Sequence, residues 1–217
     1  MNNSPRVNVM DHSDEPQEDE LTKISIEVSN CRKCPLYLSR KKAVPGEGNP
    51  RAEVMLIGEA PGRTEDETGR PFVGAAGKLL NELLHELGID RSSLYITNVV
   101  KCRPPNNRDP SEEEINACKP YLIRQIAAIK PRKIITLGKH STRVILSFNG
   151  LSISELTKVR GKVFKVNIAG VNVDVYPTYH PAAALYNPSI RNLIKEDLAK
   201  AFHVNKSGSS ILDYLNG

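Results

Sequence analysis

The sequence predicts an α/β protein with a parallel sheet, and three observations support this fold class. Short apolar runs at residues 54–58, 94–100 and 133–138 have the near-continuous hydrophobicity of strands that are buried on both faces. Each run is followed along the chain by a segment of helical character, as parallel strands require. The chain has 217 residues and no internal repeat, which is enough for one such domain with a full core.

The first apolar run leads into the most distinctive stretch of the sequence. Residues 54–58 end in the turn Gly58-Glu59-Ala60-Pro61-Gly62, which uses the conformational freedom of glycine. Ligands of open α/β sheets bind where such strands end. The loop continues to residue 74, but it matches neither the P-loop pattern nor the glycine pattern of dinucleotide-binding folds. Its one aromatic residue, Phe72, is therefore the first candidate for a ligand contact.

Turn residues and periodicity define the neighbouring elements. The segment 44–50 is rich in Pro and Gly and is expected to be a loop. Residues 75–88 carry leucines at helical spacing and end in a glycine, which predicts a helix closed by that glycine. Asn98 lies near the end of the predicted strand 94–100, where asparagine is disfavoured. It either caps a turn or offers its amide to a ligand.

A proline-rich loop at 103–110 follows. Asp109 as N-cap and Pro110 in the first helical position predict a helix that runs through Cys118. Pro120 is expected to kink or restart this helix, because proline cannot donate the helical hydrogen bond.

The rest of the chain is predicted to contain strands at 133–138, 163–168 and 171–176, and helices at 139–148 and 189–204. His180 follows the last of these strands. A loop histidine at the carboxyl end of a strand is more often functional than a histidine in the core, although a packed histidine remains the alternative.

Four cysteines form a second candidate site: Cys31, Cys34, Cys102 and Cys118. In a compartment that keeps thiols reduced, such a set is more readily explained by metal binding than by disulfides. A zinc ribbon uses two close pairs, whereas the second pair here is widely spaced. Four thiolates on this open spacing suit an iron–sulfur cluster as well or better, and zinc or unlinked core cysteines remain the alternatives.

The charge distribution favours a polyanionic partner. Residues 1–20 contain six acidic residues and one arginine, so the remaining chain has 29 basic and 19 acidic residues and a net charge of +10. A solvated lysine-rich surface is the simpler alternative. Five basic residues flank the cysteines and could offset thiolate charge or face phosphates: Arg32, Lys33, Lys101, Arg103 and Lys119.

The domain organisation follows from composition. Residues 1–20 are expected to be a disordered acidic tail, 21–204 a single domain that opens with a short helix or turn, and 205–217 a flexible tail. No apolar run reaches the roughly 18 residues of a membrane span, and the N-terminus lacks the features of a signal peptide. We therefore expect a soluble, cytoplasmic protein.

Four motifs, taken together and in this order, resemble the family-4, thermophile-type uracil-DNA glycosylases. They are Gly58-Glu-Ala-Pro-Gly62 with Glu65-Asp66, Gly69-Arg-Pro-Phe-Val-Gly74, Thr97-Asn-Val-Val-Lys-Cys-Arg-Pro-Pro105, and His180-Pro-Ala-Ala-Ala-Leu185. The resemblance spans roughly residues 31–200, and the four cysteines are placed as the 4Fe–4S ligands of that family.

The resemblance implies a three-layer α/β/α sandwich with a central four-stranded parallel sheet. It also implies a monomeric DNA repair hydrolase that flips uracil out of single- or double-stranded DNA and hydrolyses the N-glycosidic bond. In this family Phe72 would stack on uracil, Asn98 would read its edge and Glu59 would exclude thymine. His180 and the backbone N–H groups of residues 58–62 would stabilise charge on the departing base.

The water-activating group is the open question of this resemblance. The best-known uracil-DNA glycosylases have Asp at the position of Ala60. Glu59 or Glu65 acting alone, or electrostatic stabilisation without a strong base, are the alternatives. The expected substrate-binding residues are Gly58, Glu59, Ala60, Phe72, Asn98 and His180, and the expected catalytic residues are His180, Glu59 and Glu65.

Two other classes of function are compatible with parts of the sequence. A nucleic-acid-binding module stapled by a metal would explain the cysteines and the charge, but not Phe72, Asn98 and His180 at strand ends. A phosphate-ester hydrolase would explain the glycine-rich loop, but the Walker lysine is missing. Residues 211–215 also resemble a sliding-clamp peptide that lacks its usual leading glutamine.

Overall fold

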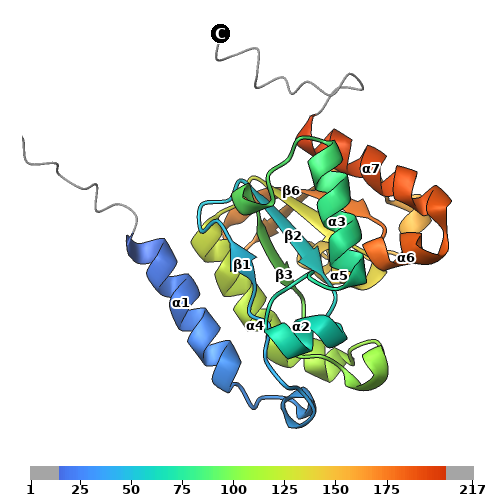
Figure 1. Ribbon diagram of the computed structural model, residues 1–217. Coiled ribbons are helices and arrows are strands. Elements are labelled where there is room, and N and C mark those ends of the chain that lie inside the picture. The colour runs from blue at the N-terminus through green and yellow to red at the C-terminus, as the bar shows by residue number, and fades with distance from the viewer. Residues whose placement is uncertain (1–14, 204–217) are drawn as a thin grey trace, which may run out of the picture.

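The computed structural model describes residues 15–203, whose centre is a six-stranded sheet of order β1-β3-β2-β4-β6-β5 (Figure 1). The four inner strands run parallel: β3 (Tyr95–Asn98), β2 (Val54–Gly58), β4 (Lys133–Leu137) and β6 (Val171–Thr178). The edge strands β1 (Glu47–Gly48) and β5 (Phe164–Ile168) are antiparallel to their neighbours. The predicted four-stranded parallel sheet is confirmed, with one antiparallel strand added at each edge.

Helices cover both faces of the sheet, so the fold is the expected three-layer sandwich. One face carries α1 (Glu15–Asn30), α4 (Glu112–Ile129) and α5 (Lys139–Ser147), and the other carries α3 (Ala75–Glu86), α6 (Pro181–Tyr186) and α7 (Pro188–Phe202). The short helix α2 (Arg63–Thr68) follows the glycine loop. Single 3-10 turns occur at Pro35–Leu38, Arg91–Ser93, Pro105–Asn107 and Leu156–Lys158.

The alternation of side chains along β2 explains why there are two cores. Met55 and Ile57 point into the apolar cluster beneath α1, α4 and α5, while Val54 and Leu56 point into the cluster beneath α3 and α7. All five residues of β2 are buried, as the continuous apolar run predicts.

The N-terminal boundary differs from the prediction. Residues 15–20, assigned from composition to a disordered tail, form the first turns of α1. Arg124 of α4 helps to hold α1 in place, because it binds Glu20 in this segment and Glu27 two turns further along the helix. The rest of the predicted acidic tail and the tip at 211–215 lie outside the described residues.

Several local predictions differ from the structure. The segment 44–50 contains β1, and α2 forms within the stretch expected to be loop. Helix α4 begins after Ser111 rather than Asp109, because the Ser111 hydroxyl accepts from the Glu114 N–H while the Glu114 carboxylate accepts from the Ser111 N–H. It then continues through Pro120 without a restart.

The carboxyl ends of the four parallel strands meet at one edge of the sheet. Gly58 and Asn98 are paired directly across β2 and β3, and the Gly138 N–H after β4 donates to the carbonyl of Thr178 in β6. This edge therefore brings the glycine loop, Asn98 and His180 together. Among the described residues no helix is long and apolar enough to cross a membrane.

Candidate active site

A cleft of about 330 Å³ lies at the carboxyl ends of the strands. It is lined by most of the residues that the sequence singled out, from four separate segments: Glu59, Ala60, Glu65, Phe72, Asn98 and His180. Gly58 lies directly beneath them, since a methyl group there would overlap both the Asn98 amide oxygen and the Phe72 ring. The sequence-predicted substrate-binding residues are therefore one structural group.

Asn98 is the most unusual polar residue of the cleft. Its side chain is 1 % exposed, yet its Oδ1 atom has no hydrogen-bond partner among the described residues. A buried polar atom left unpaired costs about 1–3 kcal/mol, so such an atom is kept where a ligand will pair with it. This geometry favours ligand recognition over turn capping for Asn98.

Phe72 is held in a backbone conformation that its residue type disfavours. Its φ angle is +51°, in the left-handed region, and its ring centroid lies 5.6 Å from that of His180. Gly77 of α3 makes room for the Phe72 backbone, because a side chain at that position would overlap the Phe72 carbonyl. Strain of this kind persists only where the surroundings enforce it.

One carboxylate holds the two loops that form the cleft wall. Glu65 accepts from the N–H of Gly62 at 3.1 Å through Oε2, and from the N–H groups of Val73 and Gly74 at 2.9 and 2.7 Å through Oε1. The glycine loop and the loop after Phe72 are thus joined through a single buried side chain. Both oxygens of Glu65 are occupied, which fits a positioning role better than proton transfer.

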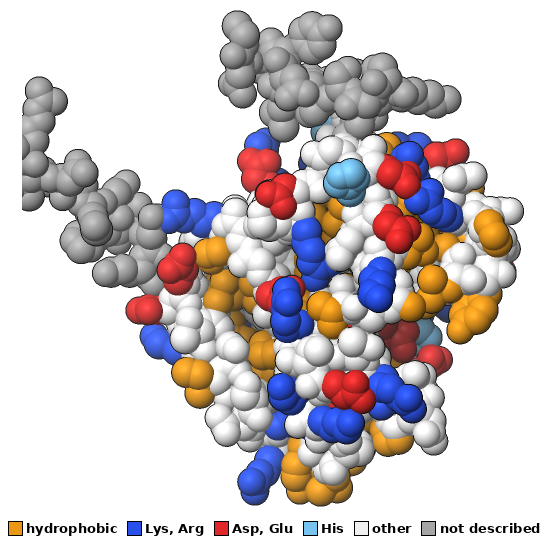
Figure 2. All heavy atoms as spheres, viewed as in Figure 1, with side chains coloured by type: hydrophobic (Ala, Val, Ile, Leu, Met, Phe, Trp, Pro, Cys, Tyr) orange, Lys and Arg blue, Asp and Glu red, His pale blue; other side chains and the backbone are white. Residues whose placement is uncertain are grey.

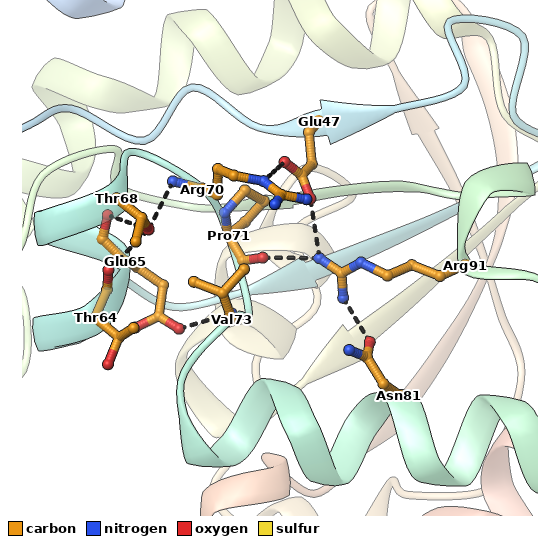
Figure 3. A network of polar contacts seen from close by, with 9 residues as sticks. All are labelled: Glu47, Thr64, Glu65, Thr68, Arg70, Pro71, Val73, Asn81 and Arg91. Atoms are coloured by element: carbon orange, nitrogen blue, oxygen red, sulfur yellow. Dashed lines mark hydrogen bonds and ion pairs between the residues drawn. The ribbon is translucent and has the colours of Figure 1, made fainter.

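Arg91 holds the other side of the Phe72 loop (Figure 3). Its guanidinium donates to the Pro71 carbonyl at 2.8 Å, to Asn81 at 2.8 Å and to Glu47 at 3.3 Å. Glu47 also binds Arg70 through both carboxylate oxygens. Figure 3 shows these residues arranged around Pro71 and Val73, so Phe72 is fixed from both flanks. The sequence did not point to Arg91 or Glu47.

His180 caps helix α6 and has a defined tautomer. Its Nδ1 accepts from the N–H of Ala182 at 3.1 Å, so in the neutral ring the proton is on Nε2. Burial lowers the pKa of His180 to about 4, and the attraction of Glu65 only partly opposes this. The imidazole is therefore neutral near pH 7 and has one N–H to donate.

Glu59 follows Gly58 at the edge of the cleft. Among the described residues its carboxylate has no hydrogen bond of its own, and Ala60 beside it has no polar side chain. Burial raises the pKa of Glu59; the positive influence of His140 opposes this and the charge of Asp109 adds to it. Sequence reasoning missed His140 and placed Asp109 only as a helix cap.

The four cysteines surround a small space between α1, α4 and the end of β3. None forms a disulfide; Cys102 and Cys118 are buried, and Cys31 and Cys34 are partly exposed. Arg40 donates to Cys102 Sγ at 3.0 Å, and the Lys101 N–H donates to Cys118 Sγ at 3.3 Å. Burial raises the pKa of the Cys118 thiol to about 12, so metal binding there must displace a proton.

The burial of Lys101 contradicts the expectation that this residue could face phosphates. The sequence placed it among the basic residues that could face phosphates, but it is 1 % exposed. Its ammonium donates to Thr97 Oγ1, to the Asn98 carbonyl at 2.7 Å and to Gln125 Oε1 at 2.7 Å. Burial lowers the pKa of Lys101 to about 7. Lys101 therefore ties the end of β3 to α4 and is unavailable to a polyanion.

A second cleft among the described residues lies away from the sequence motifs. This larger cleft, of about 920 Å³, lies at the opposite end of the strands, lined by residues such as Glu53, Lys133 and Asp174. It contains none of the motif residues. Figure 2 shows Lys and Arg side chains spread over the face that carries α2 and α3, with acidic side chains among them.

Comparison with known proteins identifies the family to which this chain belongs. The sequence pattern of the Uracil DNA glycosylase superfamily matches residues 45–202. The Type-4 uracil-DNA glycosylase of Sulfurisphaera tokodaii is 58 % identical over 183 residues, which cover 84 % of this chain and 83 % of the relative. That of Saccharolobus solfataricus is 55 % identical over 196 residues, 90 % and 91 % of the two chains. That of Archaeoglobus fulgidus is 46 % identical over 198 residues, 91 % and 100 % of the two chains.

These matches extend over the whole cleft and over most of the described chain. The matched range 45–202 contains the glycine loop, Phe72, Asn98 and His180, together with two of the four cysteines. The chain therefore belongs to the uracil-DNA glycosylase superfamily and, within it, to the type-4 uracil-DNA glycosylases.

Proposed function

We propose that this protein is a DNA repair enzyme that flips uracil out of DNA and hydrolyses its N-glycosidic bond, leaving an abasic site. The observation that carries the proposal is the buried, unpaired Oδ1 of Asn98, which lies beside the Phe72 ring in the cleft. A flipped base needs a flat apolar surface and edge hydrogen bonds, and these two side chains offer both. The proposed substrate is DNA, so the proposed place of action is inside the cell, on DNA.

Asn98 would select uracil by matching donors with acceptors. Its Oδ1 accepts from uracil N3–H and its amide N–H₂ donates to uracil O4. Cytosine presents an acceptor and a donor at these two positions, so it is rejected if the amide cannot rotate. The burial of Asn98 and its close approach to Gly58 support a fixed orientation.

Glu59 would exclude thymine by filling the space near C5 of the base. This role comes from the resemblance to the family, and the position of Glu59 in the cleft wall is compatible with it. A methyl group that meets a charged carboxylate gains no burial and displaces its water.

His180 would stabilise the departing uracil. Breaking the glycosidic bond leaves negative charge on the base, and the neutral imidazole can donate its Nε2–H to uracil O2. One of the expected helpers is less available, because the Gly62 N–H already donates to Glu65. His180 is therefore the principal donor in this proposal.

Glu65 and Glu59 divide two roles that the sequence left open. The three backbone N–H groups bound by Glu65 favour a positioning role for it. Glu59 has a free carboxylate and a raised pKa, which brings it closer to the range useful for a general base. We assign water activation to Glu59.

The four cysteines would hold a 4Fe–4S cluster. A single zinc ion with bonds of about 2.3 Å requires its sulfur ligands to lie within about 4.6 Å of one another. Among the described residues no three of these sulfur atoms lie within 4.8 Å of one another, which favours a larger cluster over zinc. N–H donors from Arg40 and Lys101 fit the same assignment, since cluster-bound sulfur atoms accept such bonds. The cluster would tie α1 to the sheet domain.

The DNA backbone would contact the basic residues around these cysteines. Within residues 15–203 none of Arg32, Lys33, Arg103 and Lys119 is paired with a carboxylate, so phosphates would meet no competing acid there. Lys33 and Lys119 lie over the rings of Tyr121 and Phe148, and Arg103 donates to Asn107. Two exposed apolar residues, Leu185 and Tyr186, follow His180 on α6. Apolar side chains at such a place can wedge between base steps and hold the flipped nucleotide out of the duplex.

A cleavage assay tests the proposal. Incubation with a uracil-containing oligonucleotide followed by alkali should cut the strand only at uracil. Asn98→Asp removes the donor to O4 and supplies an acceptor for cytosine N4–H₂, so uracil cleavage should fall far more than cytosine cleavage. Asn116→Asp, at an exposed position of α4, is the matched control and should keep native activity. Near-native uracil cleavage by Asn98→Asp would mean that Asn98 does not read the base.

A further inference from the structure

Three polar side chains from different elements converge beside the cleft. Glu59 follows β2, Asp109 precedes α4 and His140 is the second residue of α5. One carboxylate oxygen of each acid and one ring nitrogen of His140 lie within 4.8 Å of one another. Glu59 and Asp109 line the cleft. The fold thus brings together residues that are 31 to 81 positions apart.

Within this group the shortest recorded contact joins His140 and Asp109. His140 Nε2 lies 3.1 Å from Asp109 Oδ2, close enough for an ion pair when the ring is protonated. The side chain of His140 is 28 % exposed and that of Asp109 is 71 % exposed, so solvent reaches the pair. The nearby Arg108 does not neutralise Glu59, because its guanidinium is bound by both oxygens of Glu114.

Glu59 is near this pair without being bonded to it. No hydrogen bond joins Glu59 to His140 or Asp109 in the part of the chain that the structure describes, although the three ligand atoms are close. A gap of this size is suited to one bridging water, which needs two to four polar partners. The site therefore offers a position for an ordered water beside the only unpaired carboxylate of the cleft wall.

We propose that Asp109 and His140 complete the water-activating group of this enzyme, with Glu59 as the base and the other two as positioning residues. The inference rests on the proposed function. The water oxygen attacks C1′ of the deoxyribose as the C1′–N1 bond breaks, and the bonding electron pair leaves with uracil N1. The water proton passes to the Glu59 carboxylate, while Asp109 and His140 orient the water by hydrogen bonding.

This assignment would resolve the absence of a carboxylate at Ala60. The methyl side chain of Ala60 cannot accept a proton, so Glu59 acting alone would have to position the water as well as deprotonate it. A base needs its water in line with the bond that breaks. A second hydrogen-bond partner for the water, held in place by the fold, restricts the water to that position. The pair Asp109–His140 would supply it from a different strand end.

A double-mutant cycle on the holoprotein tests the inference, with single-turnover cleavage of a uracil oligonucleotide as readout. Glu59→Gln should lower the rate by roughly 10²–10⁴-fold, and His140→Ala or Asp109→Asn by roughly tenfold. If the pair acts through Glu59, adding His140→Ala to Glu59→Gln should cost less than about twofold more. A purely structural histidine would reduce both backgrounds by the same factor, and that result would overturn the inference.

Control variants distinguish a failure of this inference from a failure of the proposed function on which it rests. His85→Gln, at an exposed position of α3, should leave the rate unchanged. Retained cleavage by His140→Ala and Asp109→Asn, together with loss in His180→Ala, would overturn the inference and leave the proposed function intact. Absence of cleavage by the unmodified protein would remove the proposed function itself. The alternative is that cleavage depends on a metal ion held by these three residues. Loss of cleavage on adding EDTA, restored by Zn²⁺ at constant iron content, would indicate such an ion in place of the bridging water and overturn the assignment.

Discussion

Replacing Glu65 by glutamine separates a positioning carboxylate from a catalytic one. Glutamine can keep an oxygen toward the N–H groups of Val73 and Gly74, but its NH₂ group must then face the Gly62 N–H. One charge-assisted hydrogen bond is lost and two are weakened. Hydrogen bonds to charged groups contribute about 1.5–3 kcal/mol each, so we expect a loss of about 2–4 kcal/mol in the free energy of unfolding.

The assay compares unfolding with cleavage in two matched variants. A loss of that size should lower the melting temperature of Glu65→Gln by about 4–16 °C. Its single-turnover cleavage at low temperature should fall only modestly, through a less well fixed Phe72. Glu59→Gln should behave in the opposite way: burial raises the pKa of Glu59, so a neutral side chain there should not destabilise the fold, while cleavage should fall strongly.

One pattern of results would refute this reasoning. If Glu65→Gln keeps the native melting temperature but loses cleavage by more than about 10²-fold, Glu65 is the base and its three hydrogen bonds are incidental. Glu67→Gln, two positions along the same helix and exposed, controls for the change in net charge.

Four further outcomes are expected. Pure protein should be brown and contain iron, and Cys118→Ser should lose both colour and iron; a colourless preparation with stoichiometric zinc would contradict the cluster. Replacing Arg32, Lys33, Arg103 and Lys119 by Gln should flatten the log–log salt dependence of DNA binding, and an unchanged slope would exclude these phosphate contacts. The folded protein holds His180 at a pKa of about 4, below the usual 6.5, so it binds fewer protons than the unfolded chain between these values. The free energy of unfolding should therefore fall as the pH drops through that window, more steeply than in His180→Gln, and equal slopes would contradict the low pKa. Deleting residues 207–217 should leave oligonucleotide cleavage intact and abolish any binding to a sliding clamp, and a truncated protein that still binds the clamp would exclude the tip.

The sequence was most informative about the functional residues that lie at the ends of predicted strands. The β-branched run before Asn98 and the apolar run before Gly58 predicted both strands, and the rule that ligands bind at strand ends then placed the cleft. The Ser111-x-x-Glu114 pattern was also present in the sequence and would have corrected the start of α4.

Tertiary contacts decided what the sequence could not. Nothing local distinguishes Lys101 from an exposed lysine, because its three oxygen partners come from two separate elements. Arg91 is likewise an ordinary loop arginine until the fold places the Pro71 carbonyl beside it. His140 and Asp109 become neighbours of Glu59 only through the order of the strands.

The docking of α1 on α4 determines when the proposed metal centre could be assembled in the cell. Ile24 and Val28 are buried against α4, and Arg124 binds two glutamates of α1, so this contact does not itself depend on metal. The last cysteine, Cys118, lies 87 residues after Cys31, so a complete set of ligands exists only once α4 has been synthesised. Delivery of iron to the proposed centre would then follow the docking of α1 on α4, from the side of Cys31 and Cys34, which are partly exposed. Apoprotein produced under iron starvation should therefore show native helical circular dichroism and accept a cluster without being unfolded first.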